Sequence, residues 1–301
     1  MPPSFFMTCV NPVKIKHEGD WLEVPCGKCI ACLQLRAKNW ANRIILEARY
    51  CGFDNCCFLT LTYDNIELEK RNEVLRLDKR HIQLWLKRFR KDCDARGKKI
   101  RYYCCGEYGT SFYRPHYHVV LFGLSVTDIF IFYTNGKQVC SNGGASVQLK
   151  SWPYGYCFVA GFSEGSAFYV ASYLGKSTPE RRRMLEKLGL PPEFPMMSRK
   201  PGIGCKEVET RRDYYARHPV SGWKSIDAVK PFARHCRYLE EKIFTDEYKD
   251  ILAFENWKSD QRKKRTAEDI MLAESQGVWY GTYMEQKRIQ HERNLLGKCN
   301  H

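Results

Sequence analysis

Two short runs of strand-forming residues, 101–108 and 116–122, place the tightest limits on how this chain can fold. Both are rich in aromatic and aliphatic side chains, and the loop between them contains Gly109 and Pro115. Runs of this kind, joined by a short turn-forming segment, predict two neighbouring antiparallel strands. The helices predicted elsewhere in the chain must therefore pack against a sheet built on this pair.

Further strands and helices are expected around this pair. Strands are expected over 58–63 and near 156–160, where aromatic and β-branched residues cluster. Apolar residues at helical spacing predict a helix over about 33–50, a second helix capped by Asp78, and a third that contains residues 168–176. The order strand, helix, strand, strand, helix predicts an α+β fold, a sheet with helices packed on it.

The two ends of the chain carry weaker signals. Residues 1–33 contain several prolines and glycines and are expected to be irregular. A charged helical pattern is expected from Tyr238 to about Met271, and the last thirty residues are expected to form a loosely held helix or tail. We therefore predict an N-terminal segment over 1–50, a central domain over 51–178 and a basic, largely helical region over 179–301.

The charge balance points to a polyanionic partner. Forty-nine Lys and Arg against 34 Asp and Glu give a formal net charge of +15, which favours nucleic acid first and an anionic membrane surface second. The longest apolar stretch falls short of the about 18–20 residues of a membrane span. The first residues also lack the pattern of a signal peptide. We therefore expect a soluble cytosolic protein.

A candidate metal site lies on the predicted strand pair. Alternate residues of a strand face the same side, so His116 and His118 point one way and Tyr117 the other. Glu107 lies nine residues before His116, on the neighbouring strand, and completes a set of two imidazoles and a carboxylate. Such a set leaves coordination positions open, as catalytic sites require. It suits zinc or ferrous iron, and for a phosphodiester substrate Mg²⁺ or Mn²⁺. The alternative is ordinary surface histidines and an exposed hairpin carboxylate.

Two tyrosines and a lysine share one face of the helix in "FYVASYLGK". Tyr169, Tyr173 and Lys176 are spaced by four and three residues, which makes them neighbours on a helix surface. Tyrosines at this spacing usually pack into a core. A phenol has a pKa of about 10, so it acts as a nucleophile with help, such as a metal ion that polarises the electrophile. Lys176 is then placed to steady negative charge.

The cysteines form a second candidate metal site. The chain has 15, and most are expected to be thiols that fill apolar space. Four of them have metal-ligand spacing: Cys9, Cys26, Cys29 and Cys32. Four thiolates beside turn residues predict a structural Zn²⁺ site that folds the N-terminal segment. An iron–sulfur cluster is a weaker alternative, because Arg36 stands where the bacterial pattern has its fourth cysteine.

Five motifs in order resemble one family. They are "VPCGKCIAC", "FLTLTYD", "CGEYG" with "RPHYHVVLFG", "YVASYLGK" and "MSRKPGIG", which together span roughly residues 9 to 204. The combination resembles the replication initiator proteins of gokushovirus-like microviruses, in the HUH endonuclease superfamily. By position, His116 and His118 match the HUH pair, Tyr169 and Tyr173 match the paired nucleophiles, and Lys176 matches the lysine that follows. Glu107 is transferred as the third ligand, a position that varies across the superfamily.

The resemblance implies a rolling-circle replication initiator. Such an enzyme nicks single-stranded origin DNA, forms a 5′-phosphotyrosine link, leaves a 3′-OH primer and rejoins the displaced strand into a circle. The resemblance further implies an HUH-type antiparallel sheet beside the tyrosine helix, a divalent metal at the catalytic site, a host bacterial cytoplasm as the location, and host helicase and polymerase as partners.

The remaining expectations concern DNA contacts and alternatives. Basic side chains are expected to bind phosphates, with Arg181, Arg182, Arg183, Arg199, Lys200, Arg211 and Arg212 as candidates. The alternative interpretation is that such a run of charges is simply a solvated surface.

The alternative function is a non-enzymatic, zinc-containing DNA-binding protein. A zinc hydrolase of a small substrate is a third possibility, but it leaves the net charge and the paired tyrosines unexplained.

Overall fold

The structure is a computed structural model of the chain. It describes residues 9–17, 20–65, 76–109, 113–141, 144–217, 236–246, 269, 271–275, 277–278 and 280–297.

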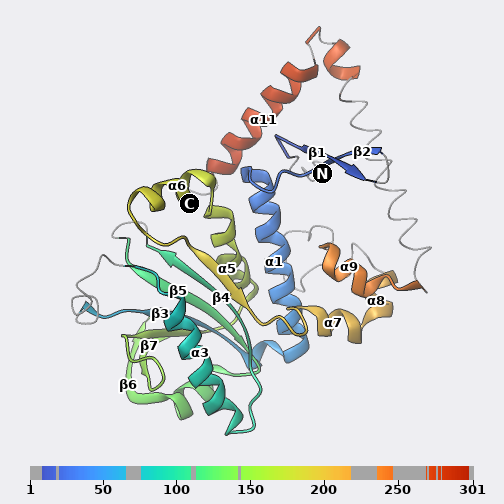
Figure 1. The fold of residues 1–301 in the computed structure, drawn as a ribbon. Helices are drawn as coiled ribbons and strands as arrows, with labels where there is room; N and C mark the ends of the chain where they lie inside the picture. Colours follow the sequence, from blue (N-terminus) through green and yellow to red (C-terminus); the bar gives the residue numbers. More distant parts are fainter. Residues whose placement is uncertain are drawn as a thin grey trace.

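The core of the molecule is a seven-stranded antiparallel sheet with the order β6-β7-β8-β3-β5-β4-β9 (Figure 1). The strands in that order are Thr134–Ser141, Gly144–Leu149, Cys157–Gly161, Cys56–Thr62, Pro115–Phe122, Arg101–Tyr108 and Phe194–Met197. The central strands β3, β5 and β4 have almost unbroken runs of buried residues, because helices cover both faces of the sheet there. The predicted α+β class is confirmed.

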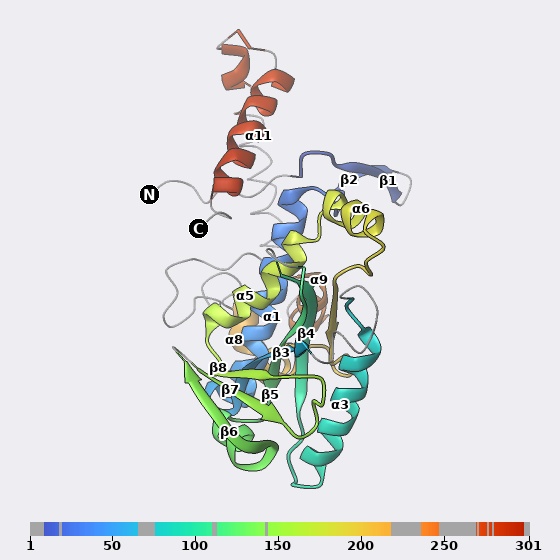
Figure 2. The same cartoon turned by 90° about the vertical axis from the view of Figure 1, so that its left-hand side faces the viewer.

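Helices α1 (Ile30–Cys51) and α5 (Glu164–Lys176) cover one face of the sheet, and α3 (Lys79–Asp94) covers the other (Figures 1 and 2). The first face buries Phe58 and Val120 against α1 and α5. The second face buries alternate residues of the same strands, including Leu59 and Val119, against α3. This alternation is the period of two that a strand imposes.

The helix ends follow the local sequence. The Asp78 side chain accepts hydrogen bonds from the backbone N–H groups of Arg80 and His81 and so caps α3, as predicted. At α5, Ser163 and Ser166 cap the first turn reciprocally, which fixes where the tyrosine helix begins. The helix predicted over 33–50 begins three residues earlier, at Ile30, directly after Cys29.

Smaller elements surround the sheet. They are β1 (Val13–His17), β2 (Asp20–Val24), a 3₁₀ turn (Phe53–Asn55), α4 (Val126–Asp128), a π-helical turn (Ile129–Tyr133), α6 (Pro179–Lys187), α7 (Cys205–Thr210), α8 (Arg212–Arg217), α9 (Arg237–Ile243) and α11 (Tyr280–Gly297). Figure 1 shows α11 standing apart from the sheet. None of the helices among the described residues combines the length and the apolar character that a membrane crossing needs.

The structure differs from the predictions made for the two ends of the chain. Residues 1–33 were expected to be irregular, but β1 and β2 form a two-stranded antiparallel hairpin there. Its strands mix charged and apolar residues and pair only with each other among the described residues. The helix expected from Tyr238 to Met271 ends at Ile243 as α9, and most of its remainder lies outside the described residues.

Candidate active site

The centre of the candidate site is the carboxylate of Glu107, which lies directly opposite His116 in the β4–β5 register. Its Oε1 atom lies 2.7 Å from Nε2 of His116 and 3.1 Å from Nε2 of His118. All three side chains are largely withdrawn from solvent. The strand pair therefore brings the three predicted ligands together, with both Nε2 atoms in contact with the Glu107 carboxylate.

The second nitrogen of each imidazole has its own partner. Nδ1 of His116 donates to the backbone carbonyl of Arg114, 3.0 Å away. Nδ1 of His118 lies 3.0 Å from the hydroxyl of Thr60, the residue opposite His118 on β3. These contacts hold both rings with Nε2 aimed at Glu107, the arrangement that metal-binding histidines adopt.

The charges of this cluster are coupled. Burial alone would raise the pKa of Glu107, but hydrogen bonds from His116 and His118 outweigh it and lower the pKa to about 2. Burial opposes protonation of His116, yet the bonds to Glu107 and to the Arg114 carbonyl leave its pKa raised. The pKa of the deeper His118 is lowered, chiefly by burial. The cluster thus keeps an ionised carboxylate in a mostly buried place.

The spacing of these atoms fits a divalent cation. Ligand atoms at about 2.1 Å from one ion, at right angles to each other, lie about 3.0 Å apart. The Glu107–His116 and Glu107–His118 separations bracket that value. The potential ligand atoms of the three residues all lie within 4.8 Å of one another. With one carboxylate oxygen and two nitrogens, the set suits Mn²⁺ or Zn²⁺ better than Mg²⁺, which prefers oxygen.

The tyrosine helix places both phenols against this cluster. The ring of Tyr173 stacks on His118 with centroids 4.9 Å apart and an interplanar angle of 9°. The ring of Tyr169 meets His118 edge-on at 5.2 Å and Tyr173 at 5.2 Å. Tyr169 is 48% exposed, whereas Tyr173 is 8% exposed. Burial raises the pKa of both phenols, so each carries its proton at neutral pH.

Two further side chains complete the surroundings of the tyrosines. Nζ of Lys176 lies 4.7 Å from the ring centre of Tyr173. Phe58 stacks on the face of His118 at 5.6 Å and meets Tyr169 edge-on at 6.0 Å. The positive charge of Lys176 thus lies beside the more buried phenol.

The four predicted cysteines also converge. Cys26 and Cys32 have their Sγ atoms 4.0 Å apart, and those of Cys29 and Cys9 are 3.9 Å apart. A tetrahedral zinc ion with Zn–S bonds of about 2.3 Å holds its sulfurs about 3.8 Å apart. The observed separations fit that geometry and exceed the about 2.05 Å of a disulfide. The cluster closes the β1–β2 hairpin onto the first turn of α1.

The local surroundings shift the pKa values of two cysteines of the cluster in opposite directions. Backbone N–H groups of Lys28 and Cys29 point at the Cys26 sulfur and lower its pKa to about 6. Burial raises the pKa of Cys32 to about 12. In the absence of a cation, the four sulfurs therefore do not all ionise at neutral pH, and a bound cation would shift them toward thiolate.

The first basic group, Arg181 to Arg183, lies on α6, which follows the tyrosine helix directly. Arg181 donates to Glu193 at 2.9 Å and to the carbonyl of Tyr108, the neighbour of Glu107. Its charge is therefore partly used within the protein. Arg182 and Arg183 are exposed on the same helix, near the candidate site.

The second basic group is not near Glu107. Ser198 donates its N–H to the carbonyl of Tyr102, so Arg199 and Lys200 lie exposed beyond the opposite end of β4. Five residues of strand separate Tyr102 from Glu107, which corresponds to about 17 Å. Arg211 and Arg212 are elsewhere again: the first pairs with Glu207 and the second donates to the carbonyl of Lys242.

A buried ion pair supports the turn that carries Arg199. Glu47 of α1 is fully buried; it pairs with Arg101 and accepts the N–H of Gly204 at 2.6 Å. Gly204 has φ +79°, and a Cβ there would lie 2.9 Å from the carbonyl oxygen of Arg43. Glycine is therefore required where the turn 198–204 meets α1.

Residues 56–178 match the family described as "Replication-associated protein ORF2/G2P". The chain is similar to replication-associated proteins of microvirus-like phages. The matched region of the chain contains Glu107, the two histidines, both tyrosines and Lys176, whereas the cysteine cluster lies outside it.

Three relatives share the description "replication-associated protein". ORF4 of Chlamydia phage 1 is 37% identical over 157 residues, 51% of this chain and 38% of that protein. ORF2 of Spiroplasma virus 4 is 29% identical over 282 residues, 89% of this chain and 82% of that protein. VP4 of Bdellovibrio phage phiMH2K is 32% identical over 192 residues, 56% of this chain and 58% of that protein. No solved structure matches the chain.

Sequence reasoning did not single out Thr60 or Phe58. Both lie on β3, and both contact His118. The motif "FLTLTYD" contains them at alternate positions, so one face of that strand carries both. The motif does not reveal that these two side chains lie next to His118, because that depends on the pairing of β3 with β5.

Proposed function

We propose that this protein is a replication initiator that starts rolling-circle replication by cutting single-stranded origin DNA with a tyrosine nucleophile. The observation that carries the proposal is the stacking of Tyr173, and the edge contact of Tyr169, on a histidine of the Glu107–His116–His118 cluster. These contacts place both phenol rings next to a cluster of possible metal ligands, where a bound ion could assist their attack on a phosphate. The order of motifs along the chain, which resembles that of HUH endonucleases, supports the same assignment.

The proposed cleavage is a transesterification. The Oη atom of one tyrosine attacks a phosphorus of the origin strand, and the bond between phosphorus and the 3′ oxygen breaks. The 5′ phosphate stays joined to the tyrosine, and the proton lost by the phenol balances the proton gained by the 3′ oxygen. Bond energy is conserved in the phosphotyrosine link, so no nucleotide hydrolysis is required.

The second tyrosine accounts for rejoining. After a round of synthesis the regenerated origin is cut by the other phenol, and the released 3′-OH attacks the first phosphotyrosine and closes the displaced strand. Tyr169 and Tyr173 both contact the ring of His118, so either can face the same phosphate site. The greater exposure of Tyr169 favours it for the first cut.

Glu107, His116 and His118 would hold the divalent ion, Mg²⁺ or Mn²⁺, that such a reaction uses. The bound ion would supply positive charge that withdraws electrons from a phosphate oxygen. The protein's own contribution is to fix that position through Thr60 and Arg114, and to place Lys176 where charge develops on the phenol or phosphate.

The other roles follow from the surroundings of this site. The four cysteines would bind a structural Zn²⁺ that holds the β1–β2 hairpin on α1. Arg182 and Arg183 would contact DNA phosphates near the scissile position, with Arg181 holding α6 in place. The protein would act in the cytoplasm of a bacterial host together with a host helicase and polymerase.

A nicking assay separates this proposal from a protein that only binds DNA. Circular single-stranded phage DNA is incubated with Mn²⁺ and protein, and linear product is measured beside binding. The variant His116→Ala/His118→Ala is expected to abolish linear product and retain most binding. Linear product at the wild-type rate from this variant would exclude the histidine cluster from the reaction.

A further inference from the structure

A basic groove lies between α3 and the edge of the sheet, on the face opposite the candidate active site. It has a volume of about 470 Å³ and is lined by α3 together with Tyr102 of β4 and Met196 of β9. That volume falls within the roughly 300–1,000 Å³ of pockets that hold small organic molecules. The groove is therefore large enough to receive a nucleotide.

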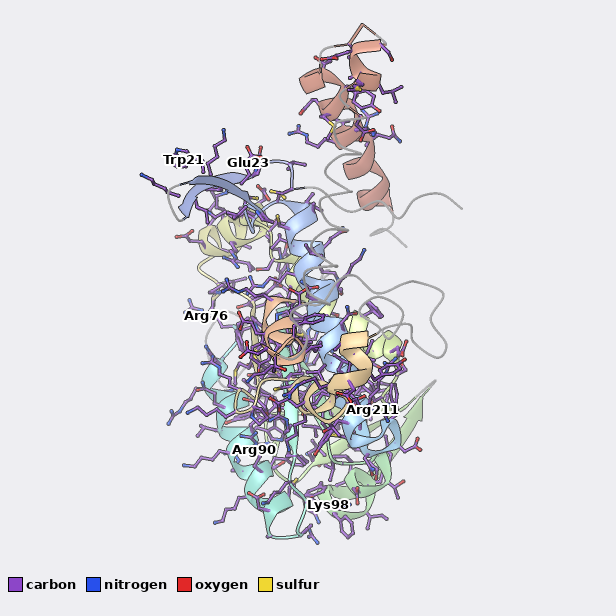
Figure 3. The ribbon with its side chains drawn as sticks, turned by 90° about the vertical axis from the view of Figure 1, so that its right-hand side faces the viewer. Trp21, Glu23, Arg76, Arg90, Lys98 and Arg211 are labelled. Atoms are coloured by element: carbon purple, nitrogen blue, oxygen red, sulfur yellow. The ribbon has the colours of Figure 1, made fainter. Side chains whose placement is uncertain are left out.

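The α3 wall of the groove is positively charged. Lys87, Arg90 and Lys91 line it, with Asp94 as the one carboxylate among the described lining residues. These side chains recur three and four residues apart, which places them along one flank of the helix. None of the ion pairs that link described residues involves these three cations. Figure 3 shows Arg90 on the side of the molecule that also carries Arg76 and Lys98.

The floor of the groove is aromatic and held in place. The guanidinium of Arg90 lies 5.1 Å from the ring centre of Tyr102. Its Nη2 donates to the hydroxyl of Ser198 at 3.2 Å, and that hydroxyl accepts the backbone N–H of Tyr102 at 3.1 Å. Arg199, which is exposed, follows Ser198 and lies close enough to Tyr102 to act on it electrostatically.

We propose that this groove binds single-stranded DNA, with a base against Tyr102 and phosphates on Lys87 and Lys91. Sites for single strands combine cations that follow the backbone with aromatic rings on which bases stack. In a duplex the base faces are stacked on one another, so they are not available to stack on the Tyr102 ring. A small anion would bind to the cations alone, so its binding would not account for Tyr102 and Met196 in the lining.

The inference rests on the proposed function, since it extends the path of the same substrate beyond the cleavage site. The groove and Glu107 lie on opposite faces of the sheet, toward opposite ends of β4. A strand bound at both would pass the edge formed by β9. The groove would therefore hold DNA that flanks the cut and have no part in the cleavage itself.

The test uses two neighbouring cations as a matched pair. Lys87 lines the groove, whereas Arg88 points to the other flank of α3, where it donates to the carbonyl of Ser151. Each is replaced by Glu in the full chain, and thermal melts check folding. Binding is measured by anisotropy with a labelled oligothymidine of roughly 30 nucleotides, longer than the about 4–16 that one single-strand binding fold covers.

The expected result is specific to the groove. Lys87→Glu should weaken binding about tenfold and reduce the slope of log affinity against log salt by about 0.7, the value for one lost phosphate contact. Tyr102→Leu should weaken binding, whereas Tyr102→Phe should bind as the wild type does, because stacking is retained. Arg88→Glu should leave the salt slope unchanged.

Equal effects of Lys87→Glu and Arg88→Glu, or a Tyr102→Leu variant that binds normally, would overturn the groove proposal. Tighter binding of the wild-type protein to duplex DNA than to the oligothymidine would overturn it as well. The proposed cleavage is scored separately, by linear product from circular phage DNA at saturating protein. Groove variants that bind weakly but still cut at saturation would support the groove and leave the cleavage proposal intact.

Discussion

The imidazole of His118 lies flat against the phenol ring of Tyr173, with ring centroids 4.9 Å apart. The same imidazole directs Nε2 to Glu107 and Nδ1 to Thr60. One side chain thus connects the sheet, a possible metal ligand set and the tyrosine helix. Because β5 and α5 meet at this ring, the position of the phenols depends on how His118 is held.

Thr60 is expected to be a positioning residue for the metal site. Thr60→Val keeps the shape of the side chain but removes the hydroxyl partner of His118 Nδ1. We expect Mn²⁺ affinity, measured by calorimetry, to fall about 10–100-fold, the range typical for loss of such partners. Thr62→Val is the control, because the Thr62 hydroxyl bonds the carbonyl of Tyr156 instead. Equal Mn²⁺ affinity in the two variants would contradict the assignment.

The cysteine cluster is expected to bind zinc and to hold the N-terminal segment. Cys29→Ser should lose the bound zinc, measured as about one equivalent by elemental analysis of the wild type. Protease cleavage within the β1–β2 hairpin should then become faster. Cys51→Ser, at the far end of α1 and outside the cluster, should retain zinc and protection. Retention of zinc by Cys29→Ser would exclude this site.

Glu47 is expected to be a major source of stability. It is fully buried and binds both Arg101 and the N–H of Gly204. Glu47→Ala leaves Arg101 without its carboxylate partner and should lower the free energy of unfolding by about 3–5 kcal/mol in urea titrations. Glu241→Ala breaks an exposed pair with Arg237 and should cost less than about 1 kcal/mol. A similar loss in both variants would show that burial of Glu47 is not decisive.

The strand pair and its three side chains could be predicted from the sequence because their relationship is local. A separation of nine residues across a short loop places Glu107 opposite His116, and the alternation of a strand places His118 on the same side. The capped start of α3 is likewise a short-range signal, since Asp78 bonds the next turn.

Other parts could not be predicted because they depend on distant partners. The edge strand β9 has four residues and includes Pro195, so its pattern alone does not indicate a strand. The β1–β2 hairpin lies in a segment rich in turn residues, and its strands bury little. The contact of α5 with His118 joins segments about fifty residues apart, and only the resemblance to a known family suggested it.

The proposed tyrosine nucleophiles are tested most directly by detecting a covalent link between tyrosine and DNA. Wild-type protein, Mn²⁺ and circular single-stranded phage DNA are incubated, denatured and treated with nuclease, and the modified peptide is identified by mass spectrometry. We expect a nucleotide on Tyr169 or Tyr173. We expect no denaturant-resistant adduct from Tyr169→Phe/Tyr173→Phe, which should fold and bind DNA normally. An undiminished adduct in the double variant would contradict the assignment of the nucleophiles.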